Sequence, residues 1–107
     1  FEWNDLNLNA EGLLPVIVQD FIDHTVLMYT HMDEEAWSKT LSTGLLTYYS
    51  KSHKEALVKG EKSGNFQYVR ELFLNGEKNA LLIKVYPMGP ACDDSEKSCF
   101  SNEIEEI

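Results

Sequence analysis

Short apolar runs rich in β-branched residues alternate with polar turns along most of the chain. The runs 13–19 and 25–31 are typical of strands, and the short link between them predicts that they pair. The run 45–50 predicts a third strand. Segments 65–74 and 80–87 flank NGEKN, whose residues favour a turn, and therefore predict a β-hairpin.

One segment has the pattern of an amphipathic helix. Asp33 suits an N-cap, two acidic residues follow it, and Gly44 comes after the last turn. The pattern predicts a helix of about 9–10 residues. One face of it carries Ala36, Trp37, Thr40 and Leu41.

The remaining polar stretches predict connections. Residues 51–59 are interpreted as a helical turn or a loop, 60–64 as a turn, and 91–99 as a polar loop. Several short strands around one helix predict a single α+β domain over residues 1–107, built mainly on antiparallel pairing.

Composition and charge exclude several classes of protein. With 107 residues, 43% of them hydrophobic, the chain can bury one core. Nine basic against eighteen acidic residues give a net charge of −9, which disfavours nucleic acid as a partner. No apolar run approaches the roughly 18 residues that span a bilayer. No leader opens the chain, so nothing in it predicts secretion.

A few residues could carry chemistry. The two cysteines, Cys92 and Cys99, could form a bridge, bind a metal or be unrelated thiols. The cluster Ser50 to Lys54 could hold a phosphate or be a solvated loop. The glycine-containing stretch Gly60 to Gly64 could contact an anion or be an ordinary turn. The three histidines are scattered along the chain.

Taken in order, six stretches resemble the phosphoribosyl-AMP cyclohydrolase family of histidine biosynthesis. The resemblance implies a small β-rich pseudo-barrel of mostly antiparallel strands with one main helix. It also implies a homodimer that shares its active sites and works in the cytoplasm. The matching stretches are GLLPVIVQD (12–20), VLMYTHMDEEAWSKTLSTG (26–44), TYYSKS (47–52), KGEKSGN (59–65), ALLIKV (80–85) and GPACDDSEKSCF (89–100).

The resemblance also implies a reaction. A zinc-activated water opens the adenine ring of phosphoribosyl-AMP by hydrolysing its N1–C6 bond. A second, hard cation, usually magnesium, is held by carboxylates. The implied partner is thus a small purine nucleotide, with zinc and magnesium as cofactors.

The metal motifs of the family are only partly present. Cys92 and Cys99 match its later zinc thiolates, but Gly76 stands where its third cysteine belongs. Asn75 and Asn79, with Glu77 between them, stand where three carboxylates belong. The candidate metal ligands are therefore Cys92, Cys99, Glu77 and Asp93, the last at a family histidine position, with a histidine of the chain as a further substitute.

The substrate motifs are better preserved. KGEKSGN is intact, and the family's arginine-rich run keeps its serines but reads Ser50-Lys51-Ser52-His53 here. No catalytic residue is assigned. The residues assigned to substrate binding are Ser50, Lys51, Ser52, Lys59, Gly60, Glu61, Ser63 and Gly64.

Three interpretations follow from these departures. The favoured one is a working cyclohydrolase with a rebuilt metal site, because the cysteine pair and KGEKSGN persist. The second is a paralogue acting on another purine nucleotide. The third is an inactive binding module that keeps the fold, since a fold alone does not establish a reaction.

Overall fold

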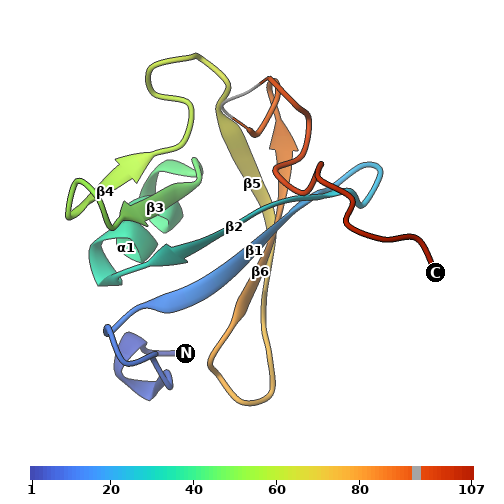
Figure 1. Ribbon diagram of the computed structural model, residues 1–107. Coiled ribbons are helices and arrows are strands. Elements are labelled where there is room, and N and C mark those ends of the chain that lie inside the picture. The colour runs from blue at the N-terminus through green and yellow to red at the C-terminus, as the bar shows by residue number, and fades with distance from the viewer. Residues whose placement is uncertain (93–94) are drawn as a thin grey trace.

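Six strands and one α-helix organise residues 1–92 and 95–107, which the computed structural model describes (Figure 1). A short 3-10 helix precedes them. The elements in chain order are η1 (Trp3–Asp5), β1 (Leu14–Asp20), β2 (Val26–Met32), α1 (Glu34–Thr43), β3 (Thr47–Ser50), β4 (Glu55–Val58), β5 (Gln67–Leu74) and β6 (Leu81–Pro87).

Four strands form the main sheet, in the order β2-β1-β6-β5. The two predicted hairpins are confirmed, because β1 pairs antiparallel with β2 and β5 pairs antiparallel with β6. The hairpins meet through β1 and β6, which run parallel, with Val18 opposite Ile83. Antiparallel pairing therefore dominates, with one parallel pair at the centre of the sheet.

The second sheet corrects the prediction for residues 51–59. These residues contain β4, which pairs antiparallel with β3 and places Ala56 opposite Tyr49. The strand is only four residues long and begins with a glutamate, so its sequence gives little period-two signal. Ala56 nevertheless packs against the core, and this tertiary contact favours the strand.

A closed barrel, as the resemblance implies, does not form among the described residues. The two sheets are separate and are joined at a single bridge between Leu45 and Tyr68. Backbone hydrogen bonds extend this junction, because Leu46 donates to Gln67 and accepts from Lys59, both at 2.9 Å. The described fold is thus a small α+β arrangement of two linked open sheets.

The predicted helix is confirmed with its end signals. Asp33 accepts a hydrogen bond from Ala36 N at 2.8 Å, and Gly44 ends the helix with φ of 75°. Ala36 and Thr40 are buried, whereas Leu41 is 53% exposed. The buried face of the helix therefore excludes Leu41, whereas Trp37 is partly buried against the core as predicted.

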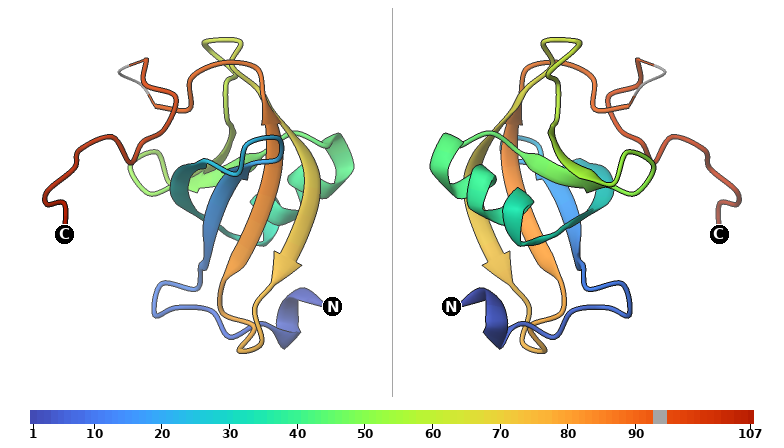
Figure 2. Two further views of the ribbon diagram at one scale, coloured as in Figure 1. Left: turned by 90° about the vertical axis from the view of Figure 1, so that its right-hand side faces the viewer. Right: turned by 90° about the vertical axis from the view of Figure 1, so that its left-hand side faces the viewer.

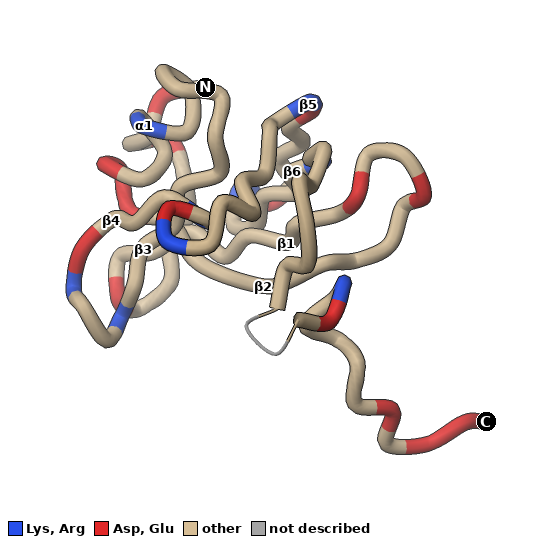
Figure 3. Tube along the Cα trace, turned by 90° about the horizontal axis from the view of Figure 1, so that it is seen from above, with Lys and Arg blue, Asp and Glu red and all other residues tan. Residues whose placement is uncertain are grey.

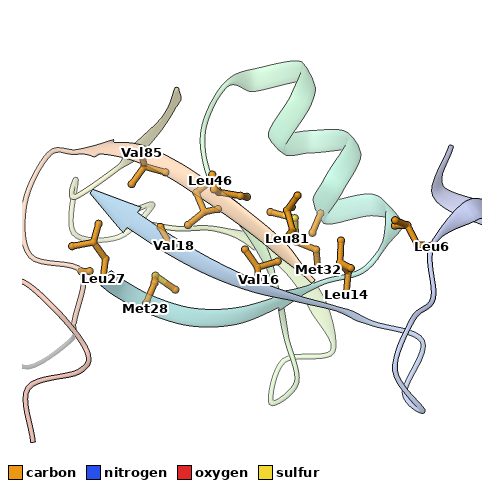
Figure 4. Packing of buried hydrophobic residues seen from close by; sticks show 13 residues of the cluster. Leu6, Leu14, Val16, Val18, Leu27, Met28, Met32, Leu46, Leu81 and Val85 are labelled. Carbon is orange, nitrogen blue, oxygen red and sulfur yellow. The ribbon is translucent and has the colours of Figure 1, made fainter. Parts of the chain in front are cut away.

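The core lies between the main sheet and the layer formed by α1, β3 and β4 (Figures 2 and 4). Alternate residues of the two central strands point inward, as in Leu14, Val16 and Val18 of β1. Leu81, Ile83 and Val85 of β6 do the same. Burying each such side chain contributes roughly 1.5–3 kcal/mol, so the core fixes the register of the central pair.

The opposite face of the main sheet carries an apolar row. Tyr29, Ile17, Leu82 and Phe73 lie side by side across all four strands, and we call them the outer row. Tyr29, Ile17 and Phe73 are each at least 40% exposed. None of the described helices is long and apolar enough to cross a membrane.

Candidate active site

A cleft of about 540 Å³ lies where β3, β4 and the loop after β4 meet. This volume lies within the range of roughly 300–1,000 Å³ typical of small-molecule sites. Four of the residues assigned to substrate binding line it: Lys59, Gly60, Glu61 and Ser63. Gly64 ends the same loop without lining the cleft.

Glycine is required where this loop packs on the chain. Gly60 has φ of +89°, and a Cβ there would lie 2.4 Å from the backbone carbonyl carbon of Asn65. Gly64 N donates to Gly60 O at 2.7 Å and closes the loop. The geometry shows why the KGEKSGN stretch needs its first glycine, since no other residue permits this approach.

Beside the loop, a small polar network borders the cleft. Ser50 Oγ lies 3.0 Å from Nδ1 of His53, and Ser52 Oγ lies 3.2 Å from the same nitrogen. His53 N also donates to Ser50 Oγ at 3.2 Å, while the His53 side chain lines the cleft. The turn between β3 and β4 thus places two hydroxyls and an imidazole next to a ligand-sized space.

Lys51 is the third residue of this turn that was assigned to substrate binding, but its side chain does not line the cleft. Its Nζ lies 3.0 Å from Oε1 of Glu11, in an exposed ion pair. Lys62 lines the cleft in addition to Lys59, and Glu55 and Glu61 line it as well. Cations and carboxylates are interspersed along the chain rather than gathered in one basic patch (Figure 3).

His53 belongs to the Ser50–Lys54 cluster but was not among the residues assigned to substrate binding, and the structure places it at the centre of this network. The available signal was its position, because it replaces an arginine of the family's serine and arginine run. Tyr48 and Leu57 supply apolar lining; Tyr48 lies in the matching stretch TYYSKS, but neither residue was assigned to the site.

The two cysteines lie on the loop after β6, beside the β1–β2 turn. Cys99 N donates to Leu27 O at 2.7 Å, and Cys92 N donates to Glu96 O at 3.2 Å. They form no disulfide; Cys92 is half-buried and Cys99 exposed. Asp93, the predicted ligand between them, lies outside the described residues.

An ion pair anchors the cysteine loop. Lys97 Nζ contacts Asp23 and lies 3.5 Å from Oδ2 of Asp20, which is largely buried. The Lys97 ammonium holds the pKa of the Asp23 carboxyl well below its usual value. Ser98 Oγ adds a hydrogen bond to Val26 O at 2.6 Å. These contacts tie the C-terminal end of the loop to β2 and to the β1–β2 turn.

Glu77 lies at the other end of the main sheet, in the turn between β5 and β6 (Figure 1). The seven residues of β6 separate that turn from the cysteine loop, which corresponds to about 20 Å at the usual rise. Among the described residues, no three His, Cys, Asp or Glu side chains gather closely enough to hold a metal. One chain therefore does not bring Glu77 to Cys92 and Cys99.

Comparisons with known proteins agree on one family. The family model described as Phosphoribosyl-AMP cyclohydrolase matches residues 28–101. The phosphoribosyl-AMP cyclohydrolase of Streptococcus mutans is 45% identical over 103 residues, 94% of each chain. That of Listeria innocua is 42% identical over 97 residues, 91% of this chain and 92% of that protein.

A longer relative has a similar sequence identity to this chain. The histidine biosynthesis bifunctional protein HisIE of Staphylococcus epidermidis is 45% identical over 96 residues, 90% of this chain. The match covers 46% of that protein, so the chain spans about half the length of this bifunctional relative. On the family match and on these identities, the chain belongs to the phosphoribosyl-AMP cyclohydrolase family.

Proposed function

We propose that the chain hydrolyses the N1–C6 bond of the purine ring in phosphoribosyl-AMP. The oxygen of water joins C6, which becomes a carboxamide carbon, and N1 leaves with a proton. The observation that carries the proposal is the ligand-sized cleft lined by the KGEKSGN loop, the motif that the chain keeps intact. Relatives that are named for this activity match nearly their full length.

The cleft offers suitable groups for a nucleotide. His53 and the neighbouring serine hydroxyls can donate hydrogen bonds to phosphate oxygens, and Lys59 and Lys62 add positive charge. Tyr48 and Leu57 provide apolar surface for a flat ring. We assign the phosphate to the polar turn and the purine to the apolar side.

Zinc is the proposed cofactor, and it needs more than one chain. A catalytic zinc takes three protein ligands, whereas the described loop of one chain supplies two thiols. We assign the third position to Glu77 of a second copy, because no single chain brings it near. When bound, zinc supplies an activated water at neutral pH. Thiolate ligands suit a reducing compartment, which supports a cytoplasmic location.

The outer row supports a homodimer. Its exposed aromatic and aliphatic side chains cross the whole sheet, and a groove of about 270 Å³ between Ile17 and Phe73 reaches the β5–β6 turn. If two copies pack through this row with strands running in opposite directions, the β5–β6 turn of one copy approaches the cysteine loop of the other. Phe73→Glu should therefore give a monomer in light scattering, whereas Phe100→Glu on the C-terminal segment should not.

The test of the function is turnover of phosphoribosyl-AMP by the purified chain with zinc added. The loss of the adenine absorbance measures this turnover. Cys99→Ser should abolish turnover, and Ser101→Ala, two residues along, should leave it intact. Binding of phosphoribosyl-AMP without turnover would favour an inactive binding module. Turnover of a different purine nucleotide alone would favour a paralogue.

A further inference from the structure

The β5–β6 turn uses its own side chains to close itself. Asn75 Oδ1 accepts hydrogen bonds from the backbone nitrogens of Asn79 and Ala80, both at 3.0 Å. Asn75 Nδ2 donates to Asn79 Oδ1 at 2.6 Å. The two amide oxygens that could face a cation are therefore already engaged within the turn.

The backbone oxygens of the turn are engaged as well. Asn7 Nδ2 donates to Glu77 O, and Asn7 N donates to Lys78 O, both at 2.8 Å. Lys78 N donates to Asn75 O at 3.0 Å. These contacts tie the turn to the N-terminal segment and leave few oxygens available to a hard ion.

The charge of the turn also disfavours a hard divalent cation such as magnesium. Glu77 is its single carboxylate, and Asn79 Nδ2 already donates to one of its oxygens at 3.3 Å. Lys78 adds a positive charge beside it. Magnesium takes hard oxygen ligands in near-octahedral geometry and is usually held by carboxylates, so this donor set does not fit it.

We infer that the β5–β6 turn of this chain is a self-closed structural turn that does not hold magnesium or another hard divalent cation, in contrast to the magnesium site that the family resemblance implies. The inference rests on hydrogen bonds and charge within one chain and does not depend on the proposed hydrolysis. It implies that magnesium does not affect nucleotide binding or turnover through this turn.

Manganese titration with NMR detection tests the inference, because bound Mn²⁺ broadens amide signals near its site. In the wild-type chain, the signals of Glu77 and Lys78 should broaden no more than those of other exposed residues. The double variant Asn75→Asp/Asn79→Asp keeps the oxygens that close the turn and adds two charges. It should bind Mn²⁺ at the turn at least about tenfold more tightly than wild type.

The charge-matched control is Ser38→Asp/Asn102→Asp, which adds the same charges at exposed positions on α1 and on the C-terminal segment. One Mn²⁺ or Mg²⁺ per wild-type chain at this turn, removed by Glu77→Gln, would overturn the inference. A folded double variant that binds no better than the control would also overturn it. The Mn²⁺ titration of the wild-type chain tests the inference even if the double variant fails to fold. Turnover of phosphoribosyl-AMP is measured in a separate assay, so a failure of the proposed hydrolysis can be distinguished from a failure of this inference.

Discussion

Ser50 Oγ and Nδ1 of His53 lie 3.0 Å apart at the edge of the cleft. The hydroxyl of Ser52 lies 3.2 Å from the same nitrogen and 3.2 Å from Ser50 Oγ, so both serines hold the imidazole at Nδ1. The ring is thus held in place by the turn that positions it, and its side chain still lines the cleft. Such a fixed polar group is suited to binding a nucleotide with little loss of side-chain freedom.

His53→Ala should raise the KM for phosphoribosyl-AMP by about tenfold or more with a smaller change in kcat. A hydrogen bond to a charged group contributes about 1.5–3 kcal/mol, which corresponds to that range. His53→Arg, the family residue, should retain most of the affinity. Steady-state kinetics would measure this, with Lys39→Ala on the distant helix as the control. An unchanged KM in His53→Ala would remove His53 from the site.

Gly60→Ala should destabilise the fold more than Gly64→Ala. Both glycines have positive φ, so each substitution costs roughly 1–2 kcal/mol in backbone strain. At Gly60 the new Cβ also meets the Asn65 backbone at 2.4 Å, whereas nothing lies within 4 Å at Gly64. Urea unfolding would compare the two free energies. Equal losses would show that the loop does not depend on the close approach.

Gln67→Met should leave the fold as stable as wild type or more stable. The Gln67 side chain is fully buried, and neither of its amide atoms has a hydrogen-bond partner among the described residues. Leaving such groups unpaired costs about 1–3 kcal/mol, which an apolar side chain of similar length avoids.

Thr40→Val is the matched comparison, because Thr40 Oγ1 donates to Ala36 O at 2.8 Å and accepts from Thr47 N at 3.0 Å. It should lower the free energy of unfolding by about 1–3 kcal/mol. Thermal melts would report both variants. A lower Tm for Gln67→Met would mean that the amide is paired, for example through an internal water.

Asp23→Asn should weaken the fold at neutral pH and lose its effect in acid. Lys97 lowers the pKa of Asp23 in the folded state, so the native chain binds fewer protons there than the unfolded chain. The stabilisation is present above the unfolded pKa of about 3.9 and is lost as the pH falls toward the folded pKa. Unfolding from pH 7 down to pH 2 would measure it. A constant difference between variant and wild type would contradict the assignment.

Gly76→Cys should increase zinc affinity in the dimer. A Cβ at Gly76 would meet no atom within 4 Å, and its φ is not in the left-handed region, so a cysteine fits without strain. It would offer a third thiol beside Glu77, which suits zinc better than a lone carboxylate. Zinc content and Co²⁺ absorbance would report the change, with Ser38→Cys at an exposed position of α1 as the control. No gain over that control would argue against a site shared with the cysteine loop.

The elements with strong local signals were predicted correctly from the sequence. Asp33 and Gly44 marked the ends of α1, and the turn residues between β5 and β6 marked that hairpin. β4 was missed because its stability comes from pairing with β3 and from packing of Ala56, which local patterns do not reveal. The bridge between Leu45 and Tyr68, which joins the two open sheets, also depends on tertiary contacts that local patterns do not reveal.

The candidate site was predicted only in part, because some of its features also depend on tertiary contacts. The KGEKSGN loop could be recognised as a unit, and the structure places five of its residues along the cleft. The distance between Glu77 and the cysteine loop follows from the length of β6, which lies between them and was predicted as a strand. The role of His53 depends on two serines that only the β3–β4 turn brings to it.

The most direct test of the proposed activity is to measure zinc per chain and phosphoribosyl-AMP turnover on the same preparation, purified without chelator. We predict near-stoichiometric zinc and adenine-ring opening, both lost in Cys92→Ser and Cys99→Ser. A folded chain that binds no zinc and opens no ring with any added metal would contradict the proposal.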